Sequence, residues 1–517
     1  MGSTTTEPET WIRASEVYKV PRTTLNDPAN RKLRVITIGA GVSGIMMAYK
    51  IQQECSNVEH VIYERNPEQG GTWFENRYPG CACDVPSHAY TYPWAPNPDW
   101  PRFLAPSKDI LAYVDKVVDR LDLAKFIHVN RQVAGCYWND DTAKWRVKIQ
   151  RVEPKADWSS TAPLKVLSEF EDECDILLHA TGILNRWDYP DIPGLKDFKG
   201  RVVHTAGWPD NYWEDQWKAE NVVVIGSGAS SIQCVPTMQP HVKHMDVFVR
   251  TPVWFVQILD NFGNNYEYMD VFVRTPVWFV QILDNFGNNY EFSTIDSTTV
   301  SSITADGVIG ANGVERKCDT IVCATGFDVS FRPRFPVIGK NGVNLQDKWA
   351  NFAEAYFGLA CVDMPNWITF LGPNWPVAAG SIMGALDANG DYAIQCIKKV
   401  QNENLKSFCP KKEASDKYNE HTQTWAKEVV WGQGCRTWYK DNETGRLRAV
   451  YAGSSRHYRS MVSLVRWEDM DLEYMNVQNK FAFMGIGRHM CQTKEGREVG
   501  MEPSPYCDIS RVDPRML

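Results

Sequence analysis

The sequence predicts an α/β protein in which one parallel-sheet unit is inserted into another. Two observations carry this prediction. An apolar strand pattern runs into a glycine-rich turn at residues 34–44, and a second pattern of the same kind does so at 221–231. After each turn the chain reaches another buried strand, and these two strands end in Ala-Thr-Gly at 180–182 and 324–326. A strand, a glycine turn and a helix begin a Rossmann-like dinucleotide-binding domain, so we expect two such domains.

The bulk composition fits a globular protein of two or three domains. The chain has 517 residues, of which 43% are hydrophobic and 23% are charged. A net charge of −8 argues against a nucleic-acid partner. The 14 cysteines show no zinc-ligand spacing, which predicts no metal site. No secretory leader or membrane-spanning run is evident, so we expect a cytoplasmic protein with reduced thiols and no membrane partner.

The first glycine turn has the full context of a dinucleotide site. A strand at 34–38 leads into Gly39, Gly41 and Gly44 of a G-x-G-x-x-G motif, and the next strand ends in Glu64. The first two glycines let the backbone approach a pyrophosphate, and the third allows the helix to pack closely on the strand. The helix N-terminus supplies amide donors. Glu64, about 20 residues after the motif, is expected to accept the ribose hydroxyls.

A segment rich in glycine and aromatic residues follows at 70–85. It contains G-G-x-W, then R-Y-P-G, then C-D, and the last two letters are Cys83 and Asp84. Cys81 and Cys83 are one residue apart, a spacing that does not fit the redox pairs of disulfide reductases. We interpret them as packing thiols. Further on, residues 133–149 alternate in polarity, which predicts an antiparallel excursion.

The segment from Phe198 to Asp210 joins the two predicted domains. Its residues have the spacing F-x-G-x-x-x-H-x-x-x-W-P, in which the histidine is His204. His204 carries the only ring in this segment that could change its hydrogen bonding near neutral pH. An ordinary linker with a packed histidine is the alternative interpretation.

Together, this linker and the 70–85 segment resemble the type I Baeyer–Villiger monooxygenases, which are class B flavin-dependent monooxygenases. The resemblance covers roughly residues 31–486. Within the family, the sequence most resembles enzymes of fungal secondary metabolism that oxidise polyketide-type ketones. It implies that a domain for FAD is interrupted by an inserted domain for NADP. It also implies that Ala82, Cys83 and Asp84 lie near the nicotinamide, and that Asp84 and His204 serve catalysis. A turn with a solvated aspartate is the alternative for Asp84. The implied FAD contacts, beyond the glycine motif and Glu64, are Thr72, Trp73, Phe74, Glu75, Asp84, Val85, Tyr90 and Val133.

The second glycine turn departs from the first in two ways. Ser231 replaces the third glycine, which a small side chain can do. The following strand ends in Arg250 rather than in an acid, and a cation there suits the 2′-phosphate of NADPH. A surface arginine without a partner is the alternative. The expected NADPH contacts are Gly226, Ser227, Gly228, Ala229, Ser230, Ser231, Val249, Arg250 and Thr251.

A repeat without a single change lies directly after this turn. Residues 245–267 recur as 269–291, so Arg250 has a duplicate in Arg274. A doubly wound sheet has one position for this strand, and one copy is therefore expected to be displaced as a loop.

A helical insertion that is typical of the family is missing after the repeat. The family typically carries a long helical insertion before the second Ala-Thr-Gly strand, and this insertion ends near an arginine that faces the flavin. Only residues 292–317 separate the second copy from that strand. Arg316, Arg332 and Arg334 lie nearby in sequence, but none of them matches the family arginine by motif.

The predicted domain organisation follows from these elements. Residues 1–30 form an N-terminal arm, 31–190 the first part of the FAD domain, and 191–316 the NADP domain. Residues 317–486 form the second part of the FAD domain with the substrate region, and 487–517 a tail.

The function implied by the resemblance is oxygen insertion next to a ketone carbonyl, which yields an ester or lactone. NADPH would reduce FAD, and the partners would be O2 and a small-molecule ketone. One alternative is a relative that oxygenates nitrogen or sulfur, for which we would expect an aromatic residue without a following proline at Trp208-Pro209. The other is a catalytically impaired, cofactor-binding remnant that lacks the active-site arginine.

Overall fold

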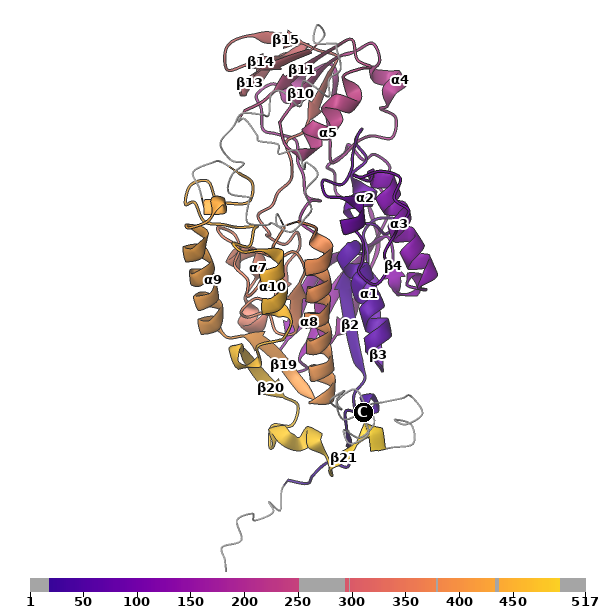
Figure 1. Cartoon of the computed structure of the whole chain (residues 1–517), viewed down its shortest axis with the longest axis vertical. Helices are drawn as coiled ribbons and strands as arrows, with labels where there is room; N and C mark the ends of the chain where they lie inside the picture. The colour runs from indigo at the N-terminus through magenta and orange to yellow at the C-terminus, as the bar shows by residue number, and fades with distance from the viewer. Residues whose placement is uncertain (1–17, 251–292, 297, 378–379, 433–436, 493–517) are drawn as a thin grey trace, which may run out of the picture.

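The computed structural model describes residues 18–250, 293–296, 298–377, 380–432 and 437–492. Figure 1 shows two units: the upper one carries β10, β11, α4 and α5, and the lower one carries β2, α1 and α8. The lower unit is built from chain segments before and after the upper one. This arrangement confirms the predicted fold of two Rossmann-like units, one inserted into the other.

The sheet of the first unit has five parallel strands in the order β18-β8-β2-β3-β4. On β2, Val35 faces one buried cluster and Ile36 faces another, because successive side chains of a strand point to opposite faces. Both faces are therefore covered, so residues 35–38 are all buried. The strands are β2 Leu33–Ile38, β3 Val58–Tyr63, β4 Ile127–His128, β8 Ile176–His179 and β18 Trp367–Thr369.

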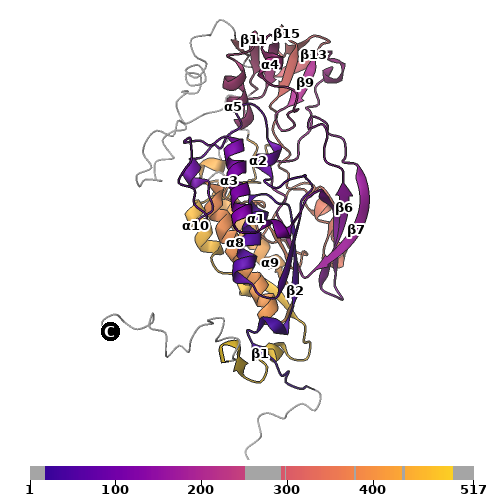
Figure 2. The same cartoon turned by 90° about the vertical axis from the view of Figure 1, so that its right-hand side faces the viewer.

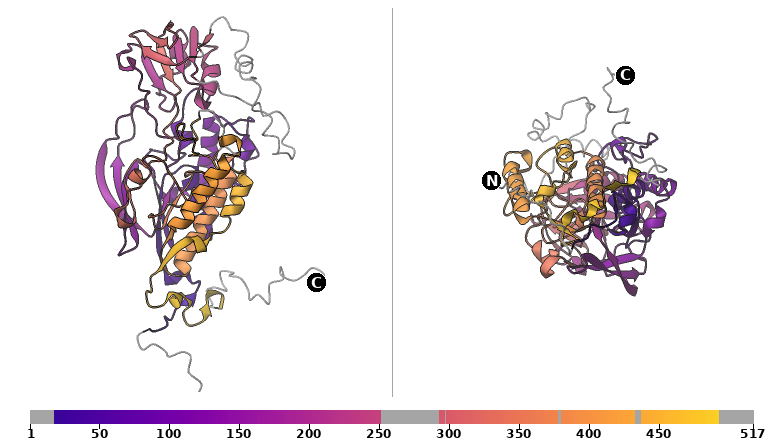
Figure 3. Two further views of the ribbon diagram at one scale, coloured as in Figure 1. Left: turned by 90° about the vertical axis from the view of Figure 1, so that its left-hand side faces the viewer. Right: turned by 90° about the horizontal axis from the view of Figure 1, so that it is seen from below.

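Helices cover one face of this sheet and a second sheet covers the other. The helices that share a core with Val35 are α1 Val42–Glu54, α3 Ser107–Arg120, α8 Ile382–Asn402 and α10 Ser455–Val462. The covering sheet has the order β17-β5-β6-β7. Figure 2 shows β6 and β7 across β2 from α8 and α10, and the left view of Figure 3 shows the same layers from the opposite side. Its strands are β5 Arg131–Asn139, β6 Lys144–Val152, β7 Val166–Cys174 and β17 Val337–Ile338, which confirms the antiparallel excursion.

The second unit repeats this plan on a smaller scale. Its five parallel strands have the order β12-β11-β10-β16-β9, with α5 packed on one face and a three-stranded meander on the other. The sheet strands are β9 Arg201–His204, β10 Asn221–Ile225, β11 His244–Phe248, β12 Ser293–Asp296 and β16 Thr320–Cys323. The other elements are α4 Glu214–Trp217, α5 Ala229–Met238, β13 Val300–Ile303, β14 Gly307–Gly310 and β15 Glu315–Lys317.

The structure bears on two expectations about this unit. The predicted return to the FAD domain at residue 317 is too early, because β16 pairs with β10 and β9 in the second sheet. The first copy of the repeat supplies β11, since Met245–Phe248 pairs with β10. The second copy, 269–291, lies outside the described residues.

The remaining elements close the ends of the first unit. The predicted arm and tail meet, because β1 Thr24–Leu25 pairs with β21 Arg488–His489. An antiparallel pair is formed by β19 Leu405–Pro410 and β20 Met470–Tyr474. Shorter or outer helices are α2 Thr72–Glu75, α7 Leu345–Lys348 and α9 Lys412–Ala426. Within the described part of the chain, no helix is both long and apolar enough to cross a membrane.

Candidate active site

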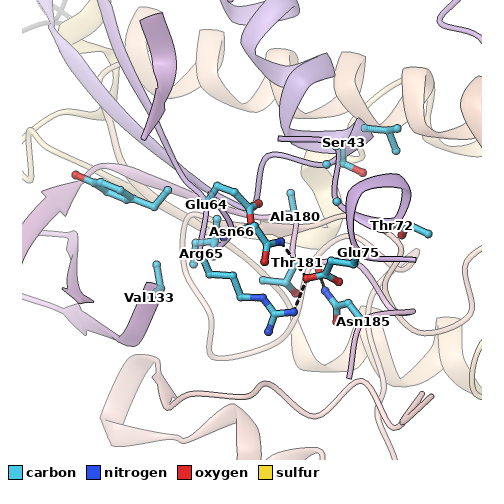
Figure 4. Close-up of a pocket in the computed structure, with 18 of the residues that line it drawn as sticks. Ser43, Glu64, Arg65, Asn66, Thr72, Glu75, Val133, Ala180, Thr181 and Asn185 are labelled. Atoms are coloured by element: carbon cyan, nitrogen blue, oxygen red, sulfur yellow. Dashed lines mark hydrogen bonds and ion pairs between the residues drawn. The ribbon is translucent and has the colours of Figure 1, made fainter. Parts of the chain in front are cut away.

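A cavity of about 400 Å³ opens at the carboxyl ends of β2, β3 and β8 (Figure 4). This is where ligands bind in open α/β sheets. Helix α2, strand β5 and the segment just before β17 complete its wall. Eight residues predicted to contact a cofactor line it: Gly39, Gly41, Glu64, Thr72, Trp73, Glu75, Tyr90 and Val133.

The floor of the cavity is formed by backbone. Gly39 has φ +103°, and a Cβ atom there would meet the carbonyl oxygen of Ala180 at 2.6 Å. A Cβ on Gly71 would meet Gly41 Cα at 2.9 Å. Gly44 does not line the cavity; its close approach to Gly39 shows the helix-packing role expected of the third glycine. This side-chain-free floor at a helix N-terminus fits the diphosphate of a dinucleotide.

Glu64 is buried at the end of β3 and holds the glycine turn in place. Its carboxylate accepts hydrogen bonds from the backbone N–H groups of Ala40 at 2.8 Å and Asn66 at 2.9 Å. Burial raises the pKa of Glu64, against the lowering effect of these two N–H donors. Each carboxylate oxygen accepts only one of these bonds, so both can still accept a ribose hydroxyl.

An ion pair lies beside Glu64. Figure 4 shows Arg65 and Asn66 reaching Glu75, with Arg65 Nη2 2.5 Å and Asn66 Nδ2 3.0 Å from Glu75 Oε1. Burial acts to raise the pKa of Glu75, but the Arg65 charge and these hydrogen bonds outweigh it and lower the pKa below its ordinary value. Glu75 is therefore a charged wall residue with its partner already in place.

Two aromatic side chains form another part of the wall. Trp73 Nε1 donates to Tyr90 Oη at 3.1 Å, and the two rings meet edge to face at 5.3 Å. Such a contact fixes both rings and suits the flat part of a ligand. Phe74, by contrast, is buried and packs on Trp158, so it supports the wall without lining the cavity.

The rest of the 70–85 segment lies at the junction of the two units. Gln233 of α5 donates to the Ala82 carbonyl at 3.0 Å and accepts from Tyr78 Oη at 2.8 Å. Cys81 and Cys83 are buried free thiols whose pKa values burial raises to about 11 and about 12, which supports packing roles. Asp84 is exposed, and neither Val85 nor any of Ala82, Cys83 and Asp84 is among the cavity-lining residues.

The second glycine turn repeats the geometry of the first. Gly226 has φ +125°, and a Cβ there would meet the carbonyl oxygen of Ala324 at 2.3 Å. Gly228 faces open space, and Ser231 is buried at the start of α5. The remaining turn residues, Ser227, Ala229 and Ser230, lie between them. Val249 is buried and Arg250 is exposed just after β11, whereas Thr251 and Arg274 lie outside the described residues.

His204 is at the end of β9 and does not touch the cavity. Its ring stacks on Trp187 at 4.6 Å, its Nδ1 accepts from the Ala206 N–H at 3.1 Å, and its Nε2 is 3.0 Å from Thr325 Oγ1. Burial lowers the pKa of His204 to about 4. The expectation that this ring changes its hydrogen bonding near neutral pH is therefore wrong, because a desolvated imidazole stays neutral there. His204 instead joins the linker to the second Ala-Thr-Gly turn.

Several cavity residues were not predicted from the sequence. Arg65, Asn66, Arg131, Asn185 and Arg334 all line it. Arg65 directly follows Glu64 and could have been considered from that position. Asn185 and Arg334 come from segments far apart in the chain, and only the pairing of β17 with β5 brings Arg334 to the cavity.

The sequence and the fold both have close counterparts. Residues 37–106 match the family model of an NAD(P)-binding Rossmann-like domain. The FAD-binding monooxygenase moxY of Dothistroma septosporum is 44% identical over 96% of this chain and 88% of its own length. The FAD-binding monooxygenase stcW of Emericella nidulans is 42% identical over 96% of this chain and 92% of its own. A Baeyer-Villiger monooxygenase of Pseudomonas aeruginosa is 28% identical over 84% and 90%.

Solved structures agree on the fold. Oxidized steroid monooxygenase bound to NADP superposes with a TM-score of 0.71 at 20% identity, over 86% of this chain and 100% of its own. Closed cyclohexanone monooxygenase gives a TM-score of 0.68 at 21% identity, over 86% and 99%. The alignment with moxY extends over 566 positions, more than the 517 residues of this chain, so that relative contains residues without a counterpart here.

Proposed function

The chain belongs to the FAD-binding monooxygenases of the Baeyer–Villiger type, and we propose that it uses FAD, NADPH and O2 to convert a ketone into an ester or lactone. The observation that carries this proposal is the paired geometry of the two glycine turns. In each turn, the alanine carbonyl of an Ala-Thr-Gly segment lies against the first glycine. In addition, Gln233 of α5 in the second unit contacts the 70–85 segment of the first unit. Two dinucleotides bound at these turns would approach each other across that junction.

The residues of the first unit fit FAD. Gly39 and Gly41 would receive the diphosphate, Glu64 the ribose, and Trp73 with Tyr90 the flat ring system. Bound FAD supplies a hydride acceptor and the means to activate O2. The protein orients the ring, keeps water from it, and places the ketone.

The second unit is proposed to hold NADPH. The turn from Gly226 to Ser231 would accept its diphosphate, and Arg250 its 2′-phosphate. Ala82, Cys83 and Asp84 would border the nicotinamide, since the backbone of Ala82 already contacts Gln233 of the second unit. Asp84 is exposed at this junction, where a bound dinucleotide would cover it.

The substrate class we propose is a polyketide-type ketone of fungal secondary metabolism. The organisms of two relatives above 40% identity, Dothistroma septosporum and Emericella nidulans, support it. The Trp208-Pro209 pair favours ketone oxidation over the alternative of nitrogen or sulfur oxygenation. The site of oxygen insertion is expected next to the carbonyl carbon.

The test is reconstitution with FAD under oxygen-18, followed by NADPH oxidation with aromatic polyketide ketones, a tertiary amine and a thioether. The proposal expects NADPH consumption and, in the presence of a ketone, an ester that carries one labelled oxygen. Label only in an N-oxide or sulfoxide would select the alternative reaction. NADPH consumption without any labelled organic product would select the impaired remnant, which the longer relative and the missing family arginine favour as the second candidate.

A further inference from the structure

Among the charged side chains of the FAD cavity, Arg334 is held by one neutral side chain. Arg65 has Glu75 as its ion-pair partner, and the Glu64 carboxylate accepts two backbone N–H groups. Arg131 donates to the carbonyl oxygens of Val129 and Asn130. Arg334 donates to the neutral amide oxygen of Asn185, and it forms no ion pair with any described residue.

The position of Arg334 is tied to the glycine floor. The side-chain amide nitrogen of Asn185, Nδ2, donates to the Thr181 carbonyl, in the Ala-Thr-Gly turn after β8. The carbonyl of the preceding residue, Ala180, is the group that lies against Gly39. A short chain of contacts therefore runs from the Arg334 guanidinium through Asn185 to the wall of the diphosphate floor.

The backbone around Arg334 is also constrained. Pro333 and Pro336 flank it, and Gln346 Nε2 donates to the Pro333 carbonyl at 3.0 Å. The Pro336 carbonyl accepts from the Cys136 N–H at 2.9 Å, where β17 joins β5. A guanidinium on such a segment is pre-organised, so little entropy is lost when it binds an anion.

The surroundings make this cation unfavourable while it faces no anion. Arg334 lines the cavity with part of its surface exposed, and desolvation of its guanidinium by the surrounding protein and the nearby Arg65 charge lower its pKa to about 9, although Glu75 opposes the change. A guanidinium held among other cations gains most from an anionic ligand. The diphosphate is the anionic part of oxidised FAD.

We propose that Arg334 is an anion-binding residue for the diphosphate of the dinucleotide in this cavity, and that Asn185 positions it. This inference rests on the proposed function, because it takes FAD as the occupant. It assigns Arg334 to cofactor binding at the diphosphate and not to the family arginine that faces the flavin ring.

The test uses full-length protein stripped of flavin and titrated with FAD, with ADP and adenosine as competitors. Arg334→Gln should weaken FAD and ADP about ten- to a hundredfold, the usual range for one charge-assisted phosphate contact. Adenosine, which has no phosphate, should bind as before. The affinities of Arg334→Lys for FAD and ADP should lie between those of the parent and of Arg334→Gln. Asn185→Ala should weaken FAD binding less than Arg334→Gln does.

Arg332→Gln is the matched control. Arg332 is two residues away, is exposed, and donates to the Gln346 carbonyl at 2.8 Å outside the FAD cavity. Its variant should bind all three ligands like the parent. Circular dichroism and melting of the apo forms show whether each variant is folded, and Arg334→Lys keeps the comparison usable if the glutamine variant unfolds.

Two results would overturn the proposal. One is unchanged affinity of Arg334→Gln for FAD and ADP. The other is an equal loss for adenosine, because Arg334 would then shape the pocket without binding the diphosphate. Failure of the parent protein to bind FAD at all would instead contradict the proposed function.

Discussion

At the scale of single residues, Glu64 holds the glycine turn, and we propose that the same carboxylate holds the ribose of FAD. It accepts the N–H groups of Ala40 and Asn66, which set the turn, and it remains able to accept ribose hydroxyls. Cofactor binding and local order are therefore coupled at this position. A change at Glu64 should affect both.

Glu64→Ala should lower the FAD content of the purified protein. The variant loses the ribose contacts and leaves two buried N–H donors without an acceptor, which costs about 1–3 kcal/mol for each unsatisfied group. The ratio of bound flavin to protein and the affinity of the apo form for FAD measure the effect. Glu59→Ala removes an exposed carboxylate from the same strand and is the control. Glu64→Ala protein with full flavin occupancy would rule out the assignment.

His204 gives a pH prediction whose sign follows from burial. The folded pKa, about 4, lies below the ordinary 6.5, so protons bind preferentially to the unfolded chain. The stabilising contribution is complete above pH 6.5 and is lost as the pH falls toward 4. Between these values one such ring adds up to about 1.4 kcal/mol per pH unit to the slope of the free energy of unfolding.

His204→Gln should therefore reduce that slope, as urea titrations across this pH range can measure. The parent should lose stability more steeply than the variant as the pH falls. His88→Gln, which removes an exposed ring, should keep the parent's slope. An unchanged slope in His204→Gln would mean that the ring is not buried in its neutral form.

Arg250 is expected to set the preference for NADPH. The first copy of the repeat forms β11, which places Arg250 rather than Arg274 after the sheet strand. Arg250→Ala should weaken NADPH about ten- to a hundredfold and leave NADH unchanged, since one charge-assisted phosphate contact is lost. Arg274→Ala is the matched control and should have no effect. If both variants keep full discrimination, another residue holds the 2′-phosphate.

At the scale of elements, the two glycine turns are built alike. In each, the first glycine has a positive φ and lies against the alanine carbonyl of an Ala-Thr-Gly turn. The neighbouring parallel strands β2 and β8, or β10 and β16, impose this contact. The second turn allows the effects of a substitution on folding and on ligand binding to be measured separately, because Gly226 is packed against protein atoms and Gly228 has free space around it.

Gly226→Ala should destabilise the protein, by about 1–3 kcal/mol for a non-glycine residue held in a disfavoured conformation. Gly228 has φ −80° and free space around it, so Gly228→Ala should have the same melting temperature as the parent protein. It should still bind NADPH more weakly, because the added methyl group keeps the backbone from the diphosphate. FAD content should be unchanged in Gly228→Ala. Equal melting temperatures for both variants would contradict this division.

At the scale of the whole molecule, cofactor binding and oxygen transfer have different requirements. Among the described residues, each of the two dinucleotide units has a parallel sheet, a glycine turn and the helix that follows it. The insertion expected before β16, with its arginine, has no counterpart by motif. Arg334 lines the cavity of the first unit, and we propose that it binds the diphosphate and not the flavin ring.

The protein should therefore consume NADPH with poor coupling to product. Loss of one pre-organised charge partner typically costs about 10²–10³ in rate, which would let activated oxygen escape as hydrogen peroxide before it reaches the ketone. Hydrogen peroxide and ester formed per NADPH consumed measure this balance, and most of the NADPH should appear as hydrogen peroxide. Tight coupling to the ester would show that another arginine has taken the missing role.

Local sequence was sufficient for the fold and for much of the FAD site. The glycine turns need particular backbone angles and the buried strands need continuous apolar runs, and both requirements are written in short stretches such as 34–44 and 221–231. Gly39, Gly41 and Glu64, which were predicted in this way, line the cavity, and five residues implied by the family resemblance line it too. The predicted domain boundary at 317 is wrong because a buried apolar strand has the same sequence pattern in either sheet. Only the pairing of β16 with β10 shows that this strand belongs to the second sheet.

Tertiary structure alone decided the rest. The two copies of the repeat are identical, so no local signal separates them; the short connection from α5 to β11 places the first copy in the sheet. The neutrality of His204 depends on Trp187 and the layers that exclude water, not on its neighbours in sequence. Arg334 and Asn185 are 149 residues apart, and their contact exists because β17 joins β5 while β8 joins β2. Desolvation and long-range charge contacts depend on which segments pack together, and that is set by the whole sheet order.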